Sequence, residues 1–246
     1  MDASMKDKLQ QYALSAAWFN PDRPPETYTG GMVTVLRELA DADPEIAAGG
    51  WSHGERKVTT SESLAELIET RKVTGATYSD GSPILNQRFM VSSPGIPYID
   101  PKQKDLGFFS FRRADDLPAQ QSIDFILHHI TFSTAVTLVR SIARHLQPDV
   151  VGADTREFGR ALRRAQTVNI RATQLVGQIS WIRGLSPEAV AGYPVTDVEE
   201  YAGGLFFLAR SEQDAARLAA LNDQLEREHT RRRLGLLPQF YDRDEV

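Results

Sequence analysis

Two acidic residues and a lysine come closest, by type and spacing, to a set of side chains that could do chemistry. Pro21-Asp22 is followed by Glu55-Arg56-Lys57, which has the form of the PD–ExK motif of restriction-type nucleases. In that motif two carboxylates hold Mg²⁺, and the lysine helps to activate water. The chemistry requires both acids at the ends of adjacent strands, whereas here Asp22 lies in a Pro-rich turn and Glu55 follows a polar segment. A metal-dependent nuclease that uses Asp22, Glu55 and Lys57 is therefore kept as the alternative function.

The histidines give no comparable site. His128 and His129 are adjacent, so on a strand their side chains point to opposite faces and cannot chelate one ion. His53, His145 and His229 occur in no metal-binding spacing. The sequence also has no cysteine, no G-x-S-x-G elbow and no Gly-rich phosphate loop, which excludes thiolate catalysis and gives no other nucleophile motif. We expect no catalytic residue, no bound metal and no cofactor.

One short segment is strongly basic. Its arginines are Arg156, Arg160, Arg163, Arg164 and, further on, Arg171. The first four share one face of a helix predicted from about 155 to 165, capped by Asp154 or Thr155, and such a face could contact phosphates. No aromatic residue is interleaved with them, and the whole chain is acidic. The pattern therefore favours a solvated helix face over a nucleic-acid site.

Composition and charge describe an ordinary globular protein. The chain has 246 residues, is 41% hydrophobic and carries a formal net charge of −5. This charge argues against a protein whose main partner is nucleic acid, because such domains usually have a basic excess, and suits a basic protein partner better. The N-terminal segment lacks the apolar core of a signal peptide, and no apolar run approaches the roughly 20 residues that span a membrane. We expect a cytoplasmic protein with no membrane contact and no direct contact with nucleic acid.

The hydrophobic pattern predicts alternating strands and helices. Period-two alternation at 14–18 predicts a strand, and helical spacing of apolar residues predicts helices at 29–43 and, most clearly, at 132–146. Further strands are predicted at 75–78, 87–91, 106–111, 123–130, 175–182 and 204–209, and further helices at 61–68 and 212–231. The continuous apolar run at 204–209 is typical of a strand that is covered on both faces.

These elements predict the α+β class, with a mixed or antiparallel sheet and helices packed on it. The chain shows no internal repeat and no linker, so residues 1–246 are interpreted as a single compact domain. Two subregions, 12–120 and 121–238, would meet near Gln120.

Aromatic and glycine positions near both ends of the chain form a pattern. At one end they are Trp18, the charged turn residues Arg23 and Glu26, Leu36 and Leu39 on the following helix, Asp43-Pro44 and Trp51. At the other end they are Gly177-Gln178-Ile179-Ser180-Trp181-Ile182 and Gly203-Gly204-Leu205-Phe206-Phe207-Leu208, before a final helix. In this pattern the chain resembles the immunity protein 52 family of bacterial toxin–antitoxin pairs. It departs from the family at Gln178, where the family tends to have an aromatic residue, in its acidic tail, and over the poorly matched middle, 72–174.

The resemblance implies a non-enzymatic cytosolic α+β protein that neutralises a cognate toxin by forming a stoichiometric complex with it. The toxin would be a nuclease effector of restriction-endonuclease type, delivered by a contact-dependent or type VI secretion system in interbacterial competition. The acidic charge agrees with this independently, because a nuclease presents a basic face to DNA and opposite charge on an inhibitor favours association.

The carboxylates expected to contact the toxin are Asp115, Asp116, Glu199, Glu200, Asp242, Asp244 and Glu245. An ordinary solvated acid is the other interpretation of each. A phage or secretion-system structural protein that assembles with itself is a further alternative for the whole chain. The sequence leaves the oligomeric state, the identity of the toxin and the surface that binds it open.

Overall fold

The computed structural model describes residues 8–19, 29–43, 86–91, 107–112, 120–167, 176–193 and 197–233, with short pieces between 52 and 73. The strand predicted at 75–78 lies outside these residues. Within the helix predicted at 61–68, Glu62 and Ser63 are helical, and Thr60 Oγ1 accepts a hydrogen bond from the Ser63 N–H at 3.2 Å.

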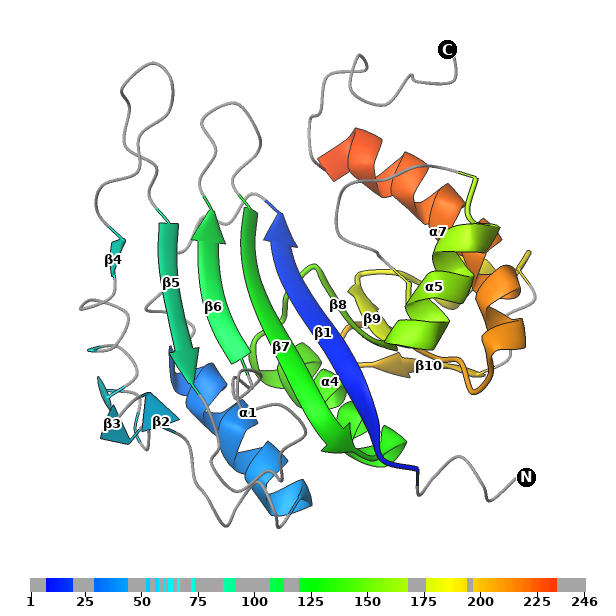
Figure 1. Cartoon of the computed structure of the whole chain (residues 1–246). Helices are drawn as coiled ribbons and strands as arrows, with labels where there is room; N and C mark the ends of the chain where they lie inside the picture. Colours follow the sequence, from blue (N-terminus) through cyan, green and yellow to red (C-terminus); the bar gives the residue numbers. More distant parts are fainter. Residues whose placement is uncertain are drawn as a thin grey trace.

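A nine-stranded sheet forms the centre of the fold (Figure 1). Its strand order is β10-β11-β9-β8-β1-β7-β6-β5-β4, and each neighbouring pair is antiparallel. The strands are β1 (Gln10–Phe19), β4 (Lys72–Val73), β5 (Asn86–Val91), β6 (Gly107–Arg112), β7 (Gln120–Ile130), β8 (Val150–Thr155), β9 (Ile179–Arg183), β10 (Asp197–Tyr201) and β11 (Gly204–Leu208). The short strands β2 (Ser52–His53) and β3 (Arg56–Lys57) form a separate sheet. The predicted α+β class is confirmed.

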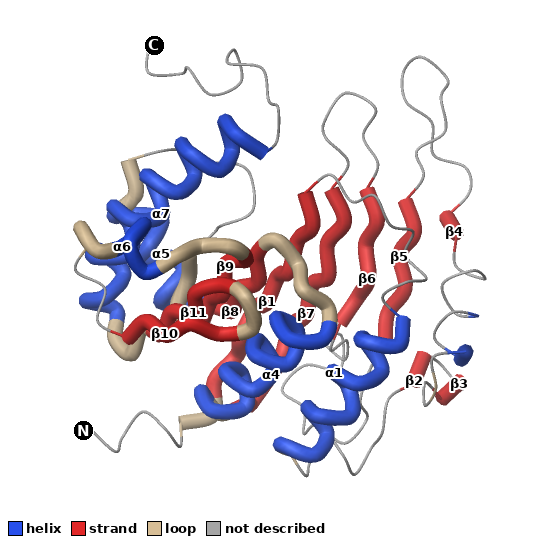
Figure 2. Tube along the Cα trace, turned by 180° about the vertical axis from the view of Figure 1, so that it is seen from behind, coloured by secondary structure: helices blue, strands red, loops and turns tan. Residues whose placement is uncertain are grey.

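Helices pack on both faces of the sheet (Figures 1 and 2). They are α1 (Thr29–Ala42), α4 (Phe132–His145), α5 (Arg156–Ala165), the short α6 (Pro187–Val190) and α7 (Glu212–Arg233). Helices α1 and α4 share one hydrophobic core with the sheet, and α5 and α7 share another. The helices predicted at 29–43, 132–146, 155–165 and 212–231 are therefore present, with ends within two residues of the expected ones.

The two cores lie on opposite faces of the sheet, because neighbouring residues of one strand belong to different cores. Phe206 of β11 belongs to the core under α1 and α4, whereas Leu205 and Phe207 belong to the core under α5 and α7. All three side chains are fully buried. The apolar run predicted to be covered on both faces is indeed covered on both faces.

Strand β1 lies in the middle of the sheet, between β7 and β8. Its residues Tyr12, Leu14, Ala16 and Trp18 are buried against α1 and α4. The Trp18 indole N–H also donates to the carbonyl oxygen of Leu146 at 3.3 Å. That bond satisfies one of the carbonyls that the last turn of a helix leaves unpaired. The strand predicted at 14–18 is present, extended at both ends.

Capping side chains fix where two helices begin. The Thr131 hydroxyl accepts a hydrogen bond from the Thr134 N–H at the start of α4, and the Thr155 hydroxyl accepts one from the Phe158 N–H at the start of α5. Both follow the usual geometry of an N-cap residue. Of the two caps expected for α5, the structure has Thr155.

The strand predicted at 175–182 is wrong at its beginning, because β9 starts at Ile179. Three backbone N–H groups before it donate to side chains, not to a neighbouring strand. The bonds run from Val176 to Asn222 Oδ1 (2.9 Å), from Gly177 to Ser180 Oγ (3.2 Å) and from Gln178 to Asp154 Oδ1 (2.6 Å). Since these donors are already used, they are not available for a ladder.

Helix α1 approaches α4 closely at Gly31. A Cβ atom there would lie 2.6 Å from Leu146 Cδ2 and 2.8 Å from the His145 carbonyl oxygen. Glycine is a poor helix former, but at this position in the first turn of α1 it permits the close contact between the helices. Further along, Glu38 Oε1 lies 2.8 Å from His145 Nε2 and 3.8 Å from a guanidinium nitrogen of Arg144, so a hydrogen bond and an ion pair join the two helices across the same interface.

We expect stability to fall in acid as this contact is lost. The Ser141 hydroxyl, followed by His145 and Arg144, lowers the pKa of the Glu38 carboxyl below its ordinary 4.5. Because the unfolded chain then binds a proton more readily than the folded one, the contribution is complete above pH 4.5 and is lost as the pH falls through the lower folded pKa. Urea unfolding followed between neutral and acidic pH measures it. Glu38→Gln should have the smaller pH dependence; equal dependence in both proteins would contradict the assignment.

Candidate functional site

Strand β10 is an edge strand of the sheet and carries three carboxylates, those of Asp197, Glu199 and Glu200. No described strand pairs with its outer side. An edge strand presents unpaired N–H and C=O groups, and charged side chains on it prevent unwanted pairing with other chains. Two of the predicted partner-binding acids, Glu199 and Glu200, therefore lie together on an edge strand. Such a strand can pair with a segment of another protein, and its charges influence which proteins can pair with it.

A two-residue turn positions this strand against β11. Ala202 has φ of 48° and Gly203 has φ of 81°, and Tyr201 pairs with Gly204. Positive φ at both turn residues is the property of a type I′ hairpin, whose twist matches that of the flanking strands. The turn thereby fixes the register of the carboxylates on β10.

The Glu199 carboxylate already has a partner within the protein. Its carboxylate forms an ion pair with Arg140 of α4. The Arg140 guanidinium carbon also lies 5.3 Å from the centre of the Tyr201 ring and 5.0 Å from the centre of the Phe206 ring, within the range of cation–π contact. The Trp181 indole N–H completes the cluster by donating to the Tyr201 carbonyl oxygen at 2.7 Å. Arg140 thus anchors the β10–β11 hairpin to α4, and Glu199 serves this anchor.

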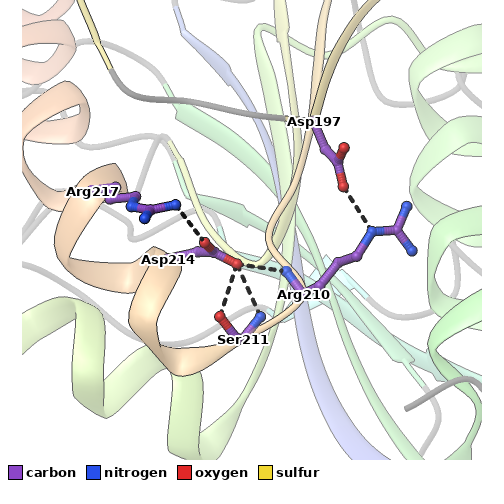
Figure 3. A network of polar contacts seen from close by, with 5 residues as sticks. All are labelled: Asp197, Arg210, Ser211, Asp214 and Arg217. Atoms are coloured by element: carbon purple, nitrogen blue, oxygen red, sulfur yellow. Dashed lines mark hydrogen bonds and ion pairs between the residues drawn. The ribbon is translucent and has the colours of Figure 1, made fainter. Parts of the chain in front are cut away.

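Asp197 also forms an ion pair with an arginine of the same protein (Figure 3). Arg210 Nε donates to Asp197 Oδ2 at 2.7 Å. Nearby, Asp214 Oδ2 accepts hydrogen bonds from the Arg210 N–H (3.1 Å), the Ser211 N–H (3.1 Å) and the Ser211 hydroxyl (3.0 Å). Arg217 lies 3.5 Å from the other oxygen of Asp214. Ser211 and Asp214 form the capping arrangement that begins α7, so Arg210 joins β10 to this helix start.

Glu200 differs from its two neighbours. Its side chain is exposed, and none of the side chains that the structure describes forms an ion pair with it. In the register of the hairpin it lies opposite Leu205. Of the three carboxylates on β10, Glu200 is thus the one whose charge the described part of the protein does not offset.

The remaining predicted acids lie outside the described residues. They are Asp115, Asp116, Asp242, Asp244 and Glu245. Asp22 and Glu55 of the alternative nuclease set also lie outside them, and Lys57 is on β3, in the two-stranded sheet. These assignments stay predictions.

No signal in the sequence marks the arginines that hold β10. The helical pattern puts Arg140 on the polar side of its helix, and nothing local distinguishes Arg210 from other surface cations. Both act on residues that lie elsewhere in the chain; the separation is 59 residues between Arg140 and Glu199. Only the folded arrangement brings these charges together.

A metal site and a membrane-spanning helix were also looked for among the described residues. No group of three or more histidine, aspartate or glutamate side chains among them is arranged to hold a metal ion. None of the helices in the described ranges is both long and apolar enough to cross a membrane.

Known proteins resemble this chain only weakly. No family model matches the chain, and the comparison with curated proteins gives no match. Among solved structures, the Pseudomonas aeruginosa T6SS protein PA0821 is similar, with a TM-score of 0.39 and 10% sequence identity over 90% of this chain and 76% of that chain. A likeness at this level carries no argument about function. The resemblance to the immunity protein 52 family stays a prediction.

Proposed function

We propose that the protein is an immunity protein that binds a cognate secreted toxin in a stoichiometric complex and thereby neutralises it. The observation that carries the proposal is the exposed carboxylate of Glu200, which no described side chain pairs, on an edge strand of a protein whose net charge is −5. The toxin would be a nuclease effector of restriction-endonuclease type, delivered by type VI secretion or by contact. The protein would act in the cytoplasm without a cofactor and without turnover.

The edge strand supports this proposal in two ways. Its outer backbone groups could pair with an extended segment of a partner, a common mode of protein recognition that supplies affinity through main-chain hydrogen bonds. Its charge would attract the basic face that a nuclease presents to DNA, which raises the association rate. The ion pairs of Arg140 with Glu199 and of Arg210 with Asp197 hold the strand in place beforehand, so less ordering is required on binding.

The first experiment is purification of the tagged protein from its native bacterium, with mass spectrometry of what co-elutes at near-equal stoichiometry. A single toxin domain, released as salt is raised, is the expected result. Recovery of the protein alone would count against the proposal, and a nuclease assay with Mg²⁺ would then come next.

With the toxin in hand, Glu200→Lys should weaken binding about tenfold, mainly through slower association, because a repulsive charge replaces an attractive one. Asp41→Lys is the matched control. Asp41 is also exposed, the charge change is the same, and the residue lies near the end of α1 and not on β10. Surface plasmon resonance at two salt concentrations separates the two variants. Equal affinities for Glu200→Lys and Asp41→Lys would rule out β10 as the contact surface.

A further inference from the structure

Helix α5 presents a continuous row of arginines. We call this row the arginine stripe; it consists of Arg156, Arg160, Arg163 and Arg164, all of them exposed. The opposite side of the helix is buried, with Phe158 and Leu162 in the core that α5 shares with α7. At 3.6 residues per turn the four arginines fall within about 100° of the helix circumference. They therefore form one surface.

These arginines differ from most other arginines whose side chains the structure describes. Five others have a carboxylate partner: Arg140 with Glu199, Arg144 with Glu38, Arg183 with Asp149, Arg210 with Asp197 and Arg217 with Asp214. None of the four stripe arginines forms an ion pair with a described side chain, although the chain has 33 acidic and 28 basic residues. The one acid on the exposed part of α5 is Glu157. The chain has more acidic than basic residues, yet none of the described carboxylates pairs with the arginine stripe.

Helix stability does not explain the stripe. Arg160 has a like-charged neighbour four residues before it, at Arg156, and others three and four residues after it, which is destabilising on a helix. Arg156 occupies the first helical position, where the helix dipole disfavours a cation. Only Arg163 and Arg164, in the last turn, are favoured by the dipole. The placement of Arg156 and Arg160 thus lowers the stability of the helix, which points to a contact with another molecule.

We propose that the arginine stripe is a docking surface for an acidic segment of another protein. The planar guanidinium group matches a carboxylate with two parallel hydrogen bonds, and the stripe offers such groups along about 12 Å of the helix, from Arg156 to Arg164. The surface is separate from β10 and opposite to it in charge, so the inference holds whether or not the proposed toxin immunity does.

Nucleic acid presents the same charge as an acidic peptide but fits the stripe less well. The exposed side of α5 has no aromatic side chain on which a base could stack. The net charge of −5 also opposes the approach of a long polyanion, whose binding depends on many phosphate contacts, more than that of a short segment with a few carboxylates. An acidic protein segment is therefore the occupant that the charges favour.

The test uses the full chain and a fluorescein-labelled peptide of six glutamates, with binding followed by fluorescence anisotropy at low salt. The expected result is binding by the wild-type protein and a loss of at least about tenfold in affinity for R156Q/R160Q/R163Q/R164Q. The control R144Q/R217Q, which is matched in charge to the double variant R156Q/R160Q, removes two arginines whose side chains are 59% and 53% exposed and should bind as the wild type does. If the fourfold variant does not fold, R156Q/R160Q tests the same point and should lose several-fold.

Three results would overturn the inference. The first is no binding of the peptide by the wild-type protein. The second is equal affinity of R156Q/R160Q and of R144Q/R217Q, which remove the same number of charges, since the charge of the whole protein would then account for binding. The third is tighter binding of a labelled DNA duplex than of the peptide, with loss of DNA binding in the stripe variant, which would make the stripe a nucleic-acid surface.

Thermal melting of the stripe variant should show a midpoint no lower than that of the wild type, because like-charge repulsion is removed.

Discussion

Replacing Gly204 by alanine should destabilise the protein by at least about 3 kcal/mol, the upper end of what overpacking usually costs. A Cβ atom at this position would overlap the carbonyl oxygen of Ile182, and it would lie 2.9 Å from the Ile182 carbonyl carbon and from Trp181 Cε2. Ile182 belongs to β9, which pairs with β11 on this side. The obstacle is backbone of a buried strand, so it cannot move aside without breaking the ladder.

The neighbouring glycine provides the control. Gly203 has φ of +81°, but a Cβ atom there would meet nothing within 4 Å. Gly203→Ala should therefore cost only about 1–2 kcal/mol, the penalty of a left-handed backbone for an L-residue. Urea unfolding of the two variants, with near-UV circular dichroism to report on the tryptophans, measures the difference. Equal losses would show that the close approach of β11 to β9 at Gly204 adds no cost of its own.

Gly204 also matters for the candidate site. It is the first residue of β11 and pairs with Tyr201, the last residue of β10. An alanine that pushes β11 away from β9 would displace the edge strand with it. We expect any partner binding at Glu200 to be lost in Gly204→Ala and retained in Gly203→Ala wherever the latter is folded.

The elements that the sequence predicts best are those with a strong local pattern. Helix α4 has apolar residues at regular helical spacing, and α5 has a capping threonine followed by a sharply two-sided helix. Strand β11 is a short, nearly continuous apolar run. In each case the period and the end signals lie within about fifteen residues, and the burial seen in the structure follows from them.

Strands β8 and β10 lack such a pattern and are not predicted from the sequence. In β8 the sequence VVGADT is broken by Gly152, and its strand character comes from pairing with β1 on one side and β9 on the other. In β10 the sequence DVEEY is mostly acidic, and its turn carries Ala-Gly where a hairpin signal would be Asn-Gly. Both strands are decided by distant neighbours.

The same distinction applies to the site. The sequence indicates Glu199 and Glu200 as exposed acids, and only the structure distinguishes them, because Arg140 reaches Glu199 from a distant helix. A residue type reveals the charge of a side chain but not whether another charge offsets it. The arginines of α5 are also evident in the sequence, where their pattern favours a solvated face. Only the structure shows that other arginines have carboxylate partners and that those of α5 differ from them.

Removal of Arg183 should have the second large effect. Asp149 is a carboxylate whose side chain is only 4% exposed, and Arg183 forms an ion pair with it. Arg183 also donates to the Gln147 carbonyl oxygen at 3.2 Å, and Gln147 itself has φ of 45°. Arg183→Ala should cost roughly 3 kcal/mol, because it leaves a buried charge without its guanidinium partner. This cost is at the low end for buried pairs, since the Arg183 side chain is 41% exposed.

A double-mutant cycle separates the lost pair from other effects of the substitution. Asp149→Asn removes the charge but keeps the shape, so Arg183→Ala introduced into that background should cost much less than in the wild-type protein. Arg183→Lys keeps a positive charge without the planar fork and should fall between the two. Urea unfolding of the four proteins of the cycle and of the lysine variant gives the free energies.

If Arg183→Ala costs the same in the wild-type and in the Asp149→Asn backgrounds, the pair contributes as little as a surface ion pair. The start of β8 would then depend on its backbone bonds. In these bonds the Asp149 N–H donates to the Ala17 carbonyl oxygen, and the Asp149 carbonyl oxygen accepts from the Arg183 N–H. Because both bonds survive either substitution, the ladder around β8 would hold its register without the charges, and the cost of Arg183→Ala would come from its lost bond to Gln147.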